Sequence, residues 1–262
     1  MREQFIFDQY GSISEARRDF LEVLLRDLRP ALGLRTALDV GCGVGLFAQH
    51  LTEMNLTVTA LDARWEHIAE ARRRFPNIRF EVADVEDPTL PRLGSFDLTL
   101  CFGLLYHLEN PFRAVRNLFL LTNTVLVIES AVIPNPRPLA CLIDEVQSPD
   151  QGIRFVAFVL SESCLAKMLL RAGFQFVYRP FTPPDHIDFR NSIDSWKRRT
   201  ILVASKRQLQ NTNLEQYSEP LSWDPWDRPI GRQVARVFRF LRKPLREKGC
   251  ILLDHGQQWW KR

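Results

Sequence analysis

The sequence predicts an α/β fold in which helices cover both faces of a mostly parallel, seven-stranded sheet. Two patterns predict it. A short apolar strand runs into a glycine-rich turn and a helix over residues 36–51, and three successive strands each end in an aspartate. Such units alternate in doubly wound sheets, where ligands bind outside the carboxyl ends of the strands. We expect this domain to cover residues 36–206.

Residues 1–35 are expected to form a helical segment that precedes the first strand. The helix is predicted to begin at Ser14 and to end near Pro30 and Gly33, because proline and glycine commonly terminate helices. Its apolar face has helical spacing and consists of Phe20, Leu21, Leu24, Leu25 and Leu28. The arm over residues 5–10 is a candidate for closing over a bound ligand.

The first strand and its turn carry the strongest pattern in the chain. After the strand Thr36–Val40, glycines stand at positions 41, 43 and 45, and a helix is predicted from Leu46. A side chain at these glycines would block the tight turn and the close approach of a ligand to the backbone. A turn of this kind presents backbone N–H groups and a helix N-terminus, which suits an anionic or polar ligand.

Three aspartates lie at the ends of the first three strands. Asp39 lies in the first strand, Asp62 follows the strand over residues 56–61, and Asp84 follows the strand over residues 78–83. One aspartate after a strand is most simply a helix N-cap. Three of them at the carboxyl edge of one sheet predict a ligand site.

The glycines and aspartates together resemble motif I and the following acidic positions of the class I S-adenosylmethionine-dependent methyltransferases. The segment from Phe96-Asp97 to Tyr106-His107-Leu108 is similar to the fourth-strand motif of that family, in which an "FD" strand runs into a "YHL" turn. The resemblance implies a Rossmann-like sheet with its last strand antiparallel. It also implies an enzyme with S-adenosylmethionine as cofactor.

The resemblance gives each acidic position a role toward that cofactor. Asp62 would accept hydrogen bonds from the ribose hydroxyls. Asp84 would receive the adenine amino group beside the backbone N–H of Val85, and Asp39 would orient the methionine amino end. The same resemblance implies these further cofactor-binding residues: Gly41, Gly43, Gly45, Ala63, Phe102 and Tyr106.

A nicotinamide dinucleotide is the rival cofactor. It shares the first strand, turn and helix, and an acidic residue about twenty positions further on. The glycines here follow the spacing G-x-G-x-G, whereas dinucleotide-binding turns have G-x-G-x-x-G. The third acidic position also suits a ligand whose adenine is bound after the third strand, so S-adenosylmethionine is favoured.

His107 is the main candidate for a general base, because histidine can take up a proton near neutral pH. The alternative is that His107 only packs at the start of the following helix. Glu129, at the end of the fifth strand, is a second candidate, and His186 in a proline-rich loop is a weaker one. An acceptor atom that carries no proton would need no base.

The second half of the domain contains the remaining strands and an insertion. Prolines over residues 130–138 are expected to prevent regular strand pairing. Residues 139–160 are expected to be an insertion, with an acidic, turn-rich stretch over residues 144–152 and an apolar one over residues 155–160. The predicted elements are strands over residues 96–102, 124–129, 174–178 and 200–205, and a helix over residues 161–171.

Residues 207–262 differ from the domain in composition. They hold eleven Lys and Arg against six Asp and Glu, and include a predicted basic helix over residues 234–248. Three interpretations stay open: an extension packed on the domain, a docking element for anionic lipid or nucleic acid, or a disordered tail. A membrane surface, contacted peripherally, and a nucleic acid are therefore possible partners, and neither is favoured.

Composition places the chain among ordinary globular enzymes. Of 262 residues, 45% are hydrophobic and 25% are charged, which allows a sizeable core. Residues 1–8 lack the apolar stretch of a signal peptide, and no run is apolar enough to span a membrane. The five cysteines are scattered and form no C-x-x-C pair, so we expect a cytoplasmic protein with neither a disulfide framework nor a metal site.

The acceptor is expected to be a small molecule: a metabolite, sugar or lipid-linked compound methylated on oxygen or nitrogen. The run Gly103–His107 also resembles the tRNA wobble-uridine carboxymethyltransferases, which are the first alternative. A non-catalytic protein that binds S-adenosylmethionine or serves as a scaffold is the second. Loss of the glycines or of Asp62 would indicate a scaffold, and all of them are present.

Overall fold

The computed structural model divides the chain into two units, residues 1–221 and residues 222–262. The predicted N-terminal arm and the predicted basic helix lie outside the described residues. The residues that the structure describes are 11–146, 151–192, 195–211 and 213–218.

The main sheet has the strand order β10-β8-β9-β5-β4-β1-β2-β3. Strands β1 to β5 pair in parallel, while β9 runs antiparallel to β5 and β8, which confirms the predicted direction of the last domain strand. The strands are β1 (Thr36–Val40), β2 (Thr57–Asp62), β3 (Arg79–Val82), β4 (Phe96–Phe102), β5 (Thr122–Ile133), β8 (Phe176–Pro180), β9 (Arg199–Ser205) and β10 (Leu214–Gln216).

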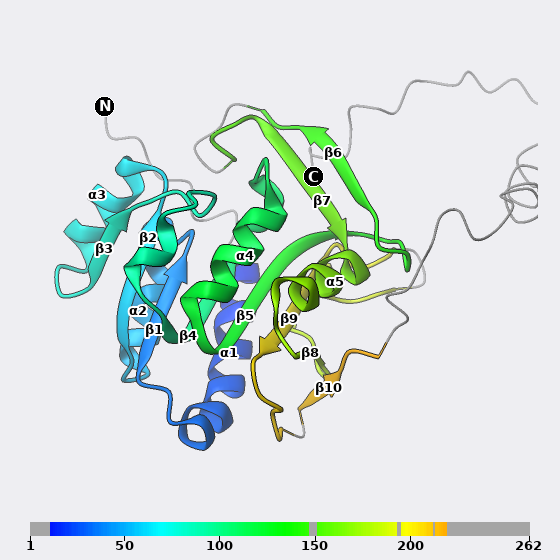
Figure 1. Cartoon of the computed structure of the whole chain (residues 1–262), viewed down its shortest axis with the longest axis horizontal. Helices are drawn as coiled ribbons and strands as arrows, with labels where there is room; N and C mark the ends of the chain where they lie inside the picture. Colours follow the sequence, from blue (N-terminus) through cyan, green and yellow to red (C-terminus); the bar gives the residue numbers. More distant parts are fainter. Residues whose placement is uncertain (1–10, 147–150, 193–194, 212, 219–262) are drawn as a thin grey trace, which may run out of the picture. The chain divides into compact units, whose positions relative to one another are not determined.

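Helices cover both faces of the sheet, as the fold class requires. Apolar side chains of α1, α2 and α3 form one core cluster with one sheet face, and those of α4 and α5 form a second cluster with the other. Figure 1 shows α4 and α5 in front of the sheet and α1 behind it. The helices are α1 (Gly11–Leu32), α2 (Leu46–Glu53), α3 (Trp65–Arg74), α4 (Pro111–Leu121) and α5 (Glu162–Ala172).

The expected insertion over residues 139–160 is a β-hairpin, which the sequence analysis did not predict. Its strands β6 (Ala140–Asp144) and β7 (Val156–Ser161) pair antiparallel, and β7 also pairs with the end of β5. Strand β5 continues to Ile133, beyond the predicted end at residue 129. Figure 1 shows the hairpin in the upper part of the view, where β7 pairs with the end of β5.

The first part of the predicted tail adds a strand to the sheet. Strand β10 pairs antiparallel with β8, and the side chains of Leu209, Leu214 and Tyr217 are buried. The backbone N–H of Leu209 donates a hydrogen bond to the Tyr178 hydroxyl at 2.9 Å. Up to residue 218 the tail is therefore packed on the domain, and the sheet contains more strands than the seven predicted.

Candidate functional site

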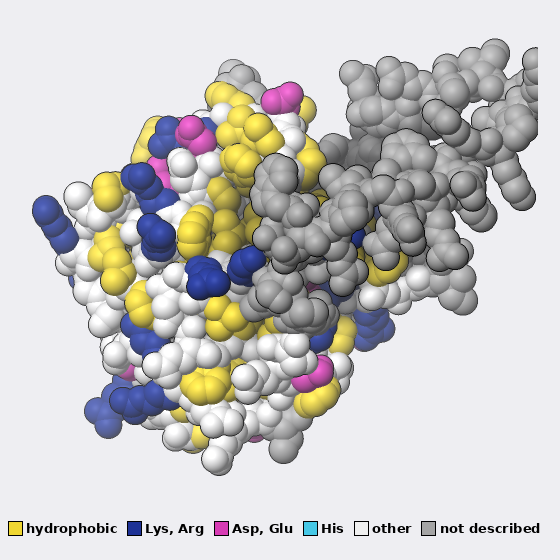
Figure 2. Space-filling view, turned by 45° about the vertical axis from the view of Figure 1, so that its right-hand side comes forward, with side chains coloured by type: hydrophobic (Ala, Val, Ile, Leu, Met, Phe, Trp, Pro, Cys, Tyr) yellow, Lys and Arg dark blue, Asp and Glu magenta, His cyan; other side chains and the backbone are white. Residues whose placement is uncertain are grey.

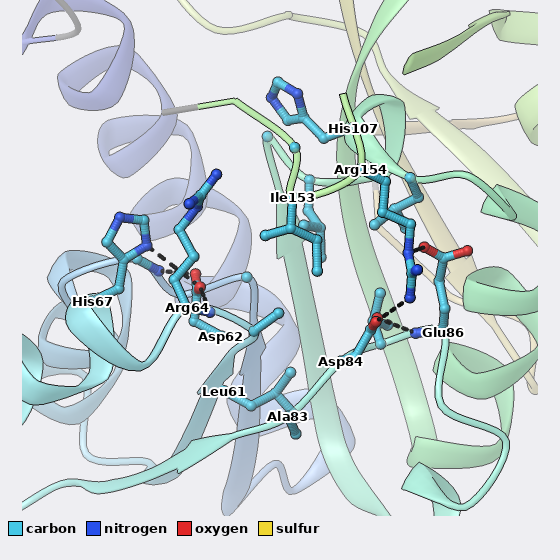
Figure 3. A pocket seen from close by; sticks show the side chains of 18 of the residues that line it. Leu61, Asp62, Arg64, His67, Ala83, Asp84, Glu86, His107, Ile153 and Arg154 are labelled. Carbon is cyan, nitrogen blue, oxygen red and sulfur yellow. Dashed lines mark hydrogen bonds and ion pairs between the residues drawn. The ribbon is translucent and has the colours of Figure 1, made fainter. Parts of the chain in front are cut away.

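A pocket opens at the carboxyl ends of β1 to β4, at the edge where the sequence places its aspartates. Figure 3 shows Asp62 and Asp84 on its floor, with His107 and Arg154 above them. The lining residues are Gly41, Gly43, Leu61, Asp62, Ala63, Arg64, His67, Ala83, Asp84, Val85, Glu86, Gly103, Leu104, His107, Leu108, Gln151, Gly152, Ile153 and Arg154.

The three glycines of the first turn are required for different reasons. Each has a positive φ, 73° at Gly41, 53° at Gly43 and 87° at Gly45, which disfavours other residues. A Cβ at Gly45 would lie 2.8 Å from the ring of Phe80, so this glycine permits close packing. A Cβ at Gly43 would meet no atom within 4 Å. The backbone at Gly43 is therefore open to a ligand.

Asp62 lies at the end of β2 and fixes the glycine turn. Its Oδ2 accepts a hydrogen bond from the Gly43 N–H at 2.9 Å, and its Oδ1 accepts one from the Arg64 N–H at 2.8 Å. A carboxylate can accept about four hydrogen bonds. Asp62 lines the pocket and so keeps acceptor capacity for hydroxyl groups of a ligand.

Asp39 is buried beneath the same turn, with an exposed fraction of 2%. Among the described residues its Oδ2 has no hydrogen-bond partner. Burial, and then the negative charge of Asp62, raise the pKa of Asp39 to about 7, which a backbone hydrogen bond from Ala48 only partly opposes. A cationic group bound nearby would favour the ionised form of this carboxyl group.

Asp84 and Val85 form the end of the pocket beyond β3. The Oδ1 of Asp84 accepts a hydrogen bond from the Glu86 N–H at 2.8 Å. The Asn117 side chain on α4 donates to the Val85 carbonyl at 2.7 Å and holds this loop in place. The role of Asn117 could not be predicted, since nothing in its helix pattern shows that it reaches the β3 loop.

Residues 151–154, which precede β7 in the hairpin, also line the pocket. Arg154 lies 3.3 Å from the Oδ2 of Asp84 and 3.5 Å from the carboxylate of Glu109. Near the end of β2, the Arg64 guanidinium donates a hydrogen bond to the Gln151 carbonyl at 2.8 Å. These residues are 70 and 87 positions from their partners, so no local pattern in the sequence could identify them.

His107, the predicted base, lines the pocket from the short 3-10 helix Leu105–His107. Its side chain is 12% exposed, and its Nδ1 makes a hydrogen bond with Glu145 of the hairpin. The Tyr106 ring packs against the imidazole with centroids 4.1 Å apart. His186, the weaker candidate, does not line this pocket; its Nδ1 accepts a hydrogen bond from the Asp188 N–H at 3.2 Å.

Glu129, the second predicted base, is fully buried and does not line the pocket. Its two oxygens accept hydrogen bonds from Arg17 at 2.8 Å and from Arg199 at 3.0 Å. Burial raises the pKa of Glu129, but the charges of the two arginines outweigh it, so the net pKa lies below the ordinary value. The carboxylate is therefore held ionised in a buried ion pair that joins α1 to β9.

The predicted cofactor-binding residues fall into two groups. Gly41, Gly43, Asp62, Ala63, Asp84 and Val85 line the pocket, whereas Asp39, Gly45, Phe102 and Tyr106 do not. Members of the second group support its walls. Phe102 packs edge to face on Phe47 at 5.2 Å, and the Tyr106 hydroxyl accepts hydrogen bonds from Arg199 at 3.2 Å.

These features fit S-adenosylmethionine. Gly43 leaves backbone open, Asp62 lines the pocket with spare acceptor capacity, and Asp39 has an unpartnered carboxylate oxygen. Asp84 lines the same pocket as Asp62. Within the described ranges, no cluster of three His, Cys, Asp or Glu side chains is placed to hold a metal ion.

Comparison with known sequences identifies the domain. The profile of the family described as "Methyltransferase domain" matches residues 37–123. A ubiquinone biosynthesis O-methyltransferase of Xanthomonas axonopodis pv. citri is 35% identical over 100 residues, which are 37% of this chain and 41% of the relative. A tRNA U34 carboxymethyltransferase of Campylobacter jejuni is 26% identical over 75% of this chain and 69% of the relative. The chain thus spans about two fifths of the ubiquinone enzymes it matches.

Solved structures share the fold. The amino pentose methyltransferase CalS10 of Micromonospora echinaspora, solved with S-adenosylmethionine, has a TM-score of 0.54 and 19% identity over 79% of this chain and all of its own. The magnesium protoporphyrin IX methyltransferase of Synechocystis, also solved with S-adenosylmethionine, has a TM-score of 0.51 and 18% identity over 79% of this chain and 87% of its own. Residues 37–123 are thus similar in sequence to the methyltransferase domain family, and the chain shares its fold with these S-adenosylmethionine-dependent methyltransferases.

Proposed function

We propose that the protein is a methyltransferase that moves the methyl group of S-adenosylmethionine to an oxygen or nitrogen atom of a small metabolite, sugar or lipid-linked acceptor. One observation carries the proposal: Gly43, Asp62, Asp84 and His107 line the same pocket. That pocket therefore combines the groups suited to the cofactor with a side chain that can take up a proton. A scaffold protein would have no need of the last of these.

S-adenosylmethionine supplies a methyl group on a sulfonium, and the acceptor forms its bond to that carbon as the C–S bond breaks and its electron pair returns to sulfur. The turn at Gly43 and the carboxylates of Asp62 and Asp84 hold the ligand. His107 takes the proton of the acceptor hydroxyl or amine. The hairpin turn excludes water and orients the acceptor, which contributes about 7–11 kcal/mol in favourable cases.

The surface of the hairpin supports an acceptor with an apolar part. On this hairpin, Leu142, Val146 and Phe155 expose 59%, 74% and 45% of their surface. Figure 2 shows hydrophobic side chains gathered on the upper part of the molecule, where Figure 1 places the hairpin. Exposed apolar patches of this kind often mark binding surfaces, so a lipid-linked acceptor is the first class to test.

A tRNA wobble uridine is the second candidate acceptor. It is favoured by the similarity to the Campylobacter tRNA U34 carboxymethyltransferase, which extends over three quarters of this chain. The basic composition of residues 207–262 also suits an anionic partner. We further propose a cytoplasmic location from the scattered cysteines. No helix in the described part of the chain is long and apolar enough to cross a membrane.

Two experiments test the proposal in sequence. Isothermal titration calorimetry is expected to show saturable binding of S-adenosylmethionine and much weaker binding of NADH. Incubation with methyl-labelled S-adenosylmethionine and separate panels of lipids, sugars, metabolites and tRNA is then expected to label one class. Tighter binding of NADH would refute the cofactor, and saturable binding without labelling of any class would support the scaffold alternative.

A further inference from the structure

The β6–β7 hairpin brings a buried carboxylate against the candidate base. Glu145 follows β6 and its side chain is only 5% exposed. One of its oxygens makes a hydrogen bond with the Nδ1 of His107, which lies 38 positions earlier in the chain. The other accepts a hydrogen bond from the Gly152 N–H at 2.8 Å. Glu145 therefore joins the hairpin turn and His107 in one connected unit.

The close approach of the turn to His107 depends on a glycine. A Cβ at position 152 would lie 2.5 Å from the His107 carbonyl oxygen and 2.7 Å from the Oε2 of Glu145. Contacts this short do not occur for real side chains, so any other residue would push the turn away. The hairpin is thus shaped to bring Glu145 to the imidazole.

Such a contact has a defined chemical consequence for a histidine base. An ionised carboxylate has no proton to donate, so the Nδ1 must carry the proton of this hydrogen bond. The neutral ring then holds its free electron pair on Nε2, and a carboxylate at Nδ1 stabilises the imidazolium that forms on proton uptake. The Tyr106 ring, with its centroid 4.1 Å away, packs on the same imidazole.

We propose that Glu145 is the positioning residue of His107: it fixes the Nδ1–H tautomer and directs Nε2 toward the acceptor. This inference rests on the proposed function, in which His107 takes the acceptor proton. The hairpin then has two roles in the site. It covers the pocket with residues 151–154, and through Glu145 it completes the base.

The tautomer can be measured without an acceptor or a cofactor. Nitrogen-15 NMR of the imidazole rings in the full chain distinguishes Nδ1–H from Nε2–H at a pH where the ring is neutral. The His107→Gln variant assigns the resonances of His107 by their loss. We expect the wild-type ring to be Nδ1–H, the Glu145→Ala variant to lose this state, and Glu145→Gln to keep it, because the amide oxygen still accepts from Nδ1–H.

The neighbouring residue supplies the matched control. Asp144, the last residue of β6, is also a carboxylate and is exposed, so Asp144→Ala is expected to leave the His107 spectrum unchanged. An Nε2–H ring in the wild-type protein would overturn the proposal whether or not the Ala variant folds, as would an unchanged Nδ1–H ring in Glu145→Ala. Calorimetry with S-adenosylmethionine tests the proposed function separately, so the two can fail independently.

Discussion

The two sides of the pocket are built by different means. On the side of β1 to β3, the contacts join residues close in sequence: Gly43 bonds to Asp62 over 19 positions, and Asp62 bonds to Arg64 over two. On the hairpin side, Arg154 reaches Asp84 over 70 positions. The first side uses backbone N–H groups of a turn, and the second uses long side chains. This difference supports the proposed division of the pocket, in which the β1 to β3 side holds the cofactor and the hairpin side orients the acceptor.

The largest effect is expected for a change at His107, where the two sides of the pocket meet. This change should affect the chemical step and leave cofactor binding intact. His107→Gln cannot take up the acceptor proton and is expected to lower the chemical step by roughly 10²–10⁴-fold. Affinity for S-adenosylmethionine should stay near the wild-type value. Single-turnover methyl transfer with the acceptor found in the screen measures the step, and His186→Gln is the control. A wild-type rate in the His107 variant, or an equal loss in the His186 variant, would remove His107 as the base.

Changes on the glycine side should instead act on cofactor affinity. Gly43→Val fills the space left open at the turn and strains a backbone with positive φ, and Asp62→Ala removes a carboxylate acceptor. Each is expected to weaken binding of S-adenosylmethionine at least tenfold, about 1.4 kcal/mol. Calorimetry measures the loss, with the exposed Glu66→Ala as control. Wild-type affinity in both variants would contradict the assignment of this side to the cofactor.

Asp39 predicts a pH dependence for the same side. Its raised pKa, about 7, means that the free protein binds a proton that a cationic ligand should displace. Affinity for S-adenosylmethionine is therefore expected to rise as the pH increases toward 7 and then to level off. Calorimetry from about pH 5.5 to 8.5, a range centred on that titration, should show an affinity that depends less on pH for Asp39→Asn than for the wild-type protein.

Asp39→Asn should also change the stability of the free protein, and here it is expected to be stabilising. The pKa of Asp39 is higher in the folded protein than in the unfolded chain, so the ionised carboxyl group destabilises the folded state. The free energy of unfolding is therefore expected to fall as the pH rises from the unfolded pKa of 3.8 to about 7. Asp39→Asn removes this cost and is expected to raise the melting temperature of the free protein most above pH 7. A lower melting temperature at all pH values would show that the carboxylate is satisfied in the folded state.

The smallest effect is expected on the hairpin side. Arg154 is about half exposed, and exposed ion pairs contribute about 0–1 kcal/mol. Arg154→Ala is therefore expected to change the affinity for S-adenosylmethionine by less than about fivefold. The exposed Arg113→Ala serves as control in the same titration. A loss as large as that of Asp62→Ala would show that both sides hold the cofactor and would end the distinction drawn above.

The division of the pocket also explains how far the sequence could predict it. The glycine spacing and the position of Asp62 after a strand are local patterns, and parallel strands bring their carboxyl ends to one edge. Hence the mostly parallel sheet could be predicted, and so could the residues Gly43, Asp62 and Asp84 that line the pocket at its carboxyl edge. The sequence predicts the hairpin only as an insertion. Its strands lie beyond a run of prolines, and their pairing with each other and with the end of β5 has no local pattern. Glu145 and Arg154 depend on that pairing and had no local pattern.

Glu129 shows the limit of reading a role from position alone. The sequence places it at the end of a strand, like Asp62, but Glu129 lies within β5, and two arginines from distant elements take up its oxygens. One of these, Arg17, comes from the N-terminal helix, and the pairing could not be derived from either segment separately. The role of Glu129 as a base stays a prediction, and His107 has the better placement for it.

The ion pair of Arg17 and Glu129 spans 112 positions and has a consequence for the order in which the chain folds. During synthesis, α1 leaves the ribosome long before β5, the strand that carries its partner. Until then the apolar face of α1 and the charge of Arg17 lack their native surroundings. Closing so long a loop is slow, and the exposed helix is open to aggregation or chaperone binding in the interval. The nascent chain must therefore grow past residue 129 before Arg17 can meet its buried partner.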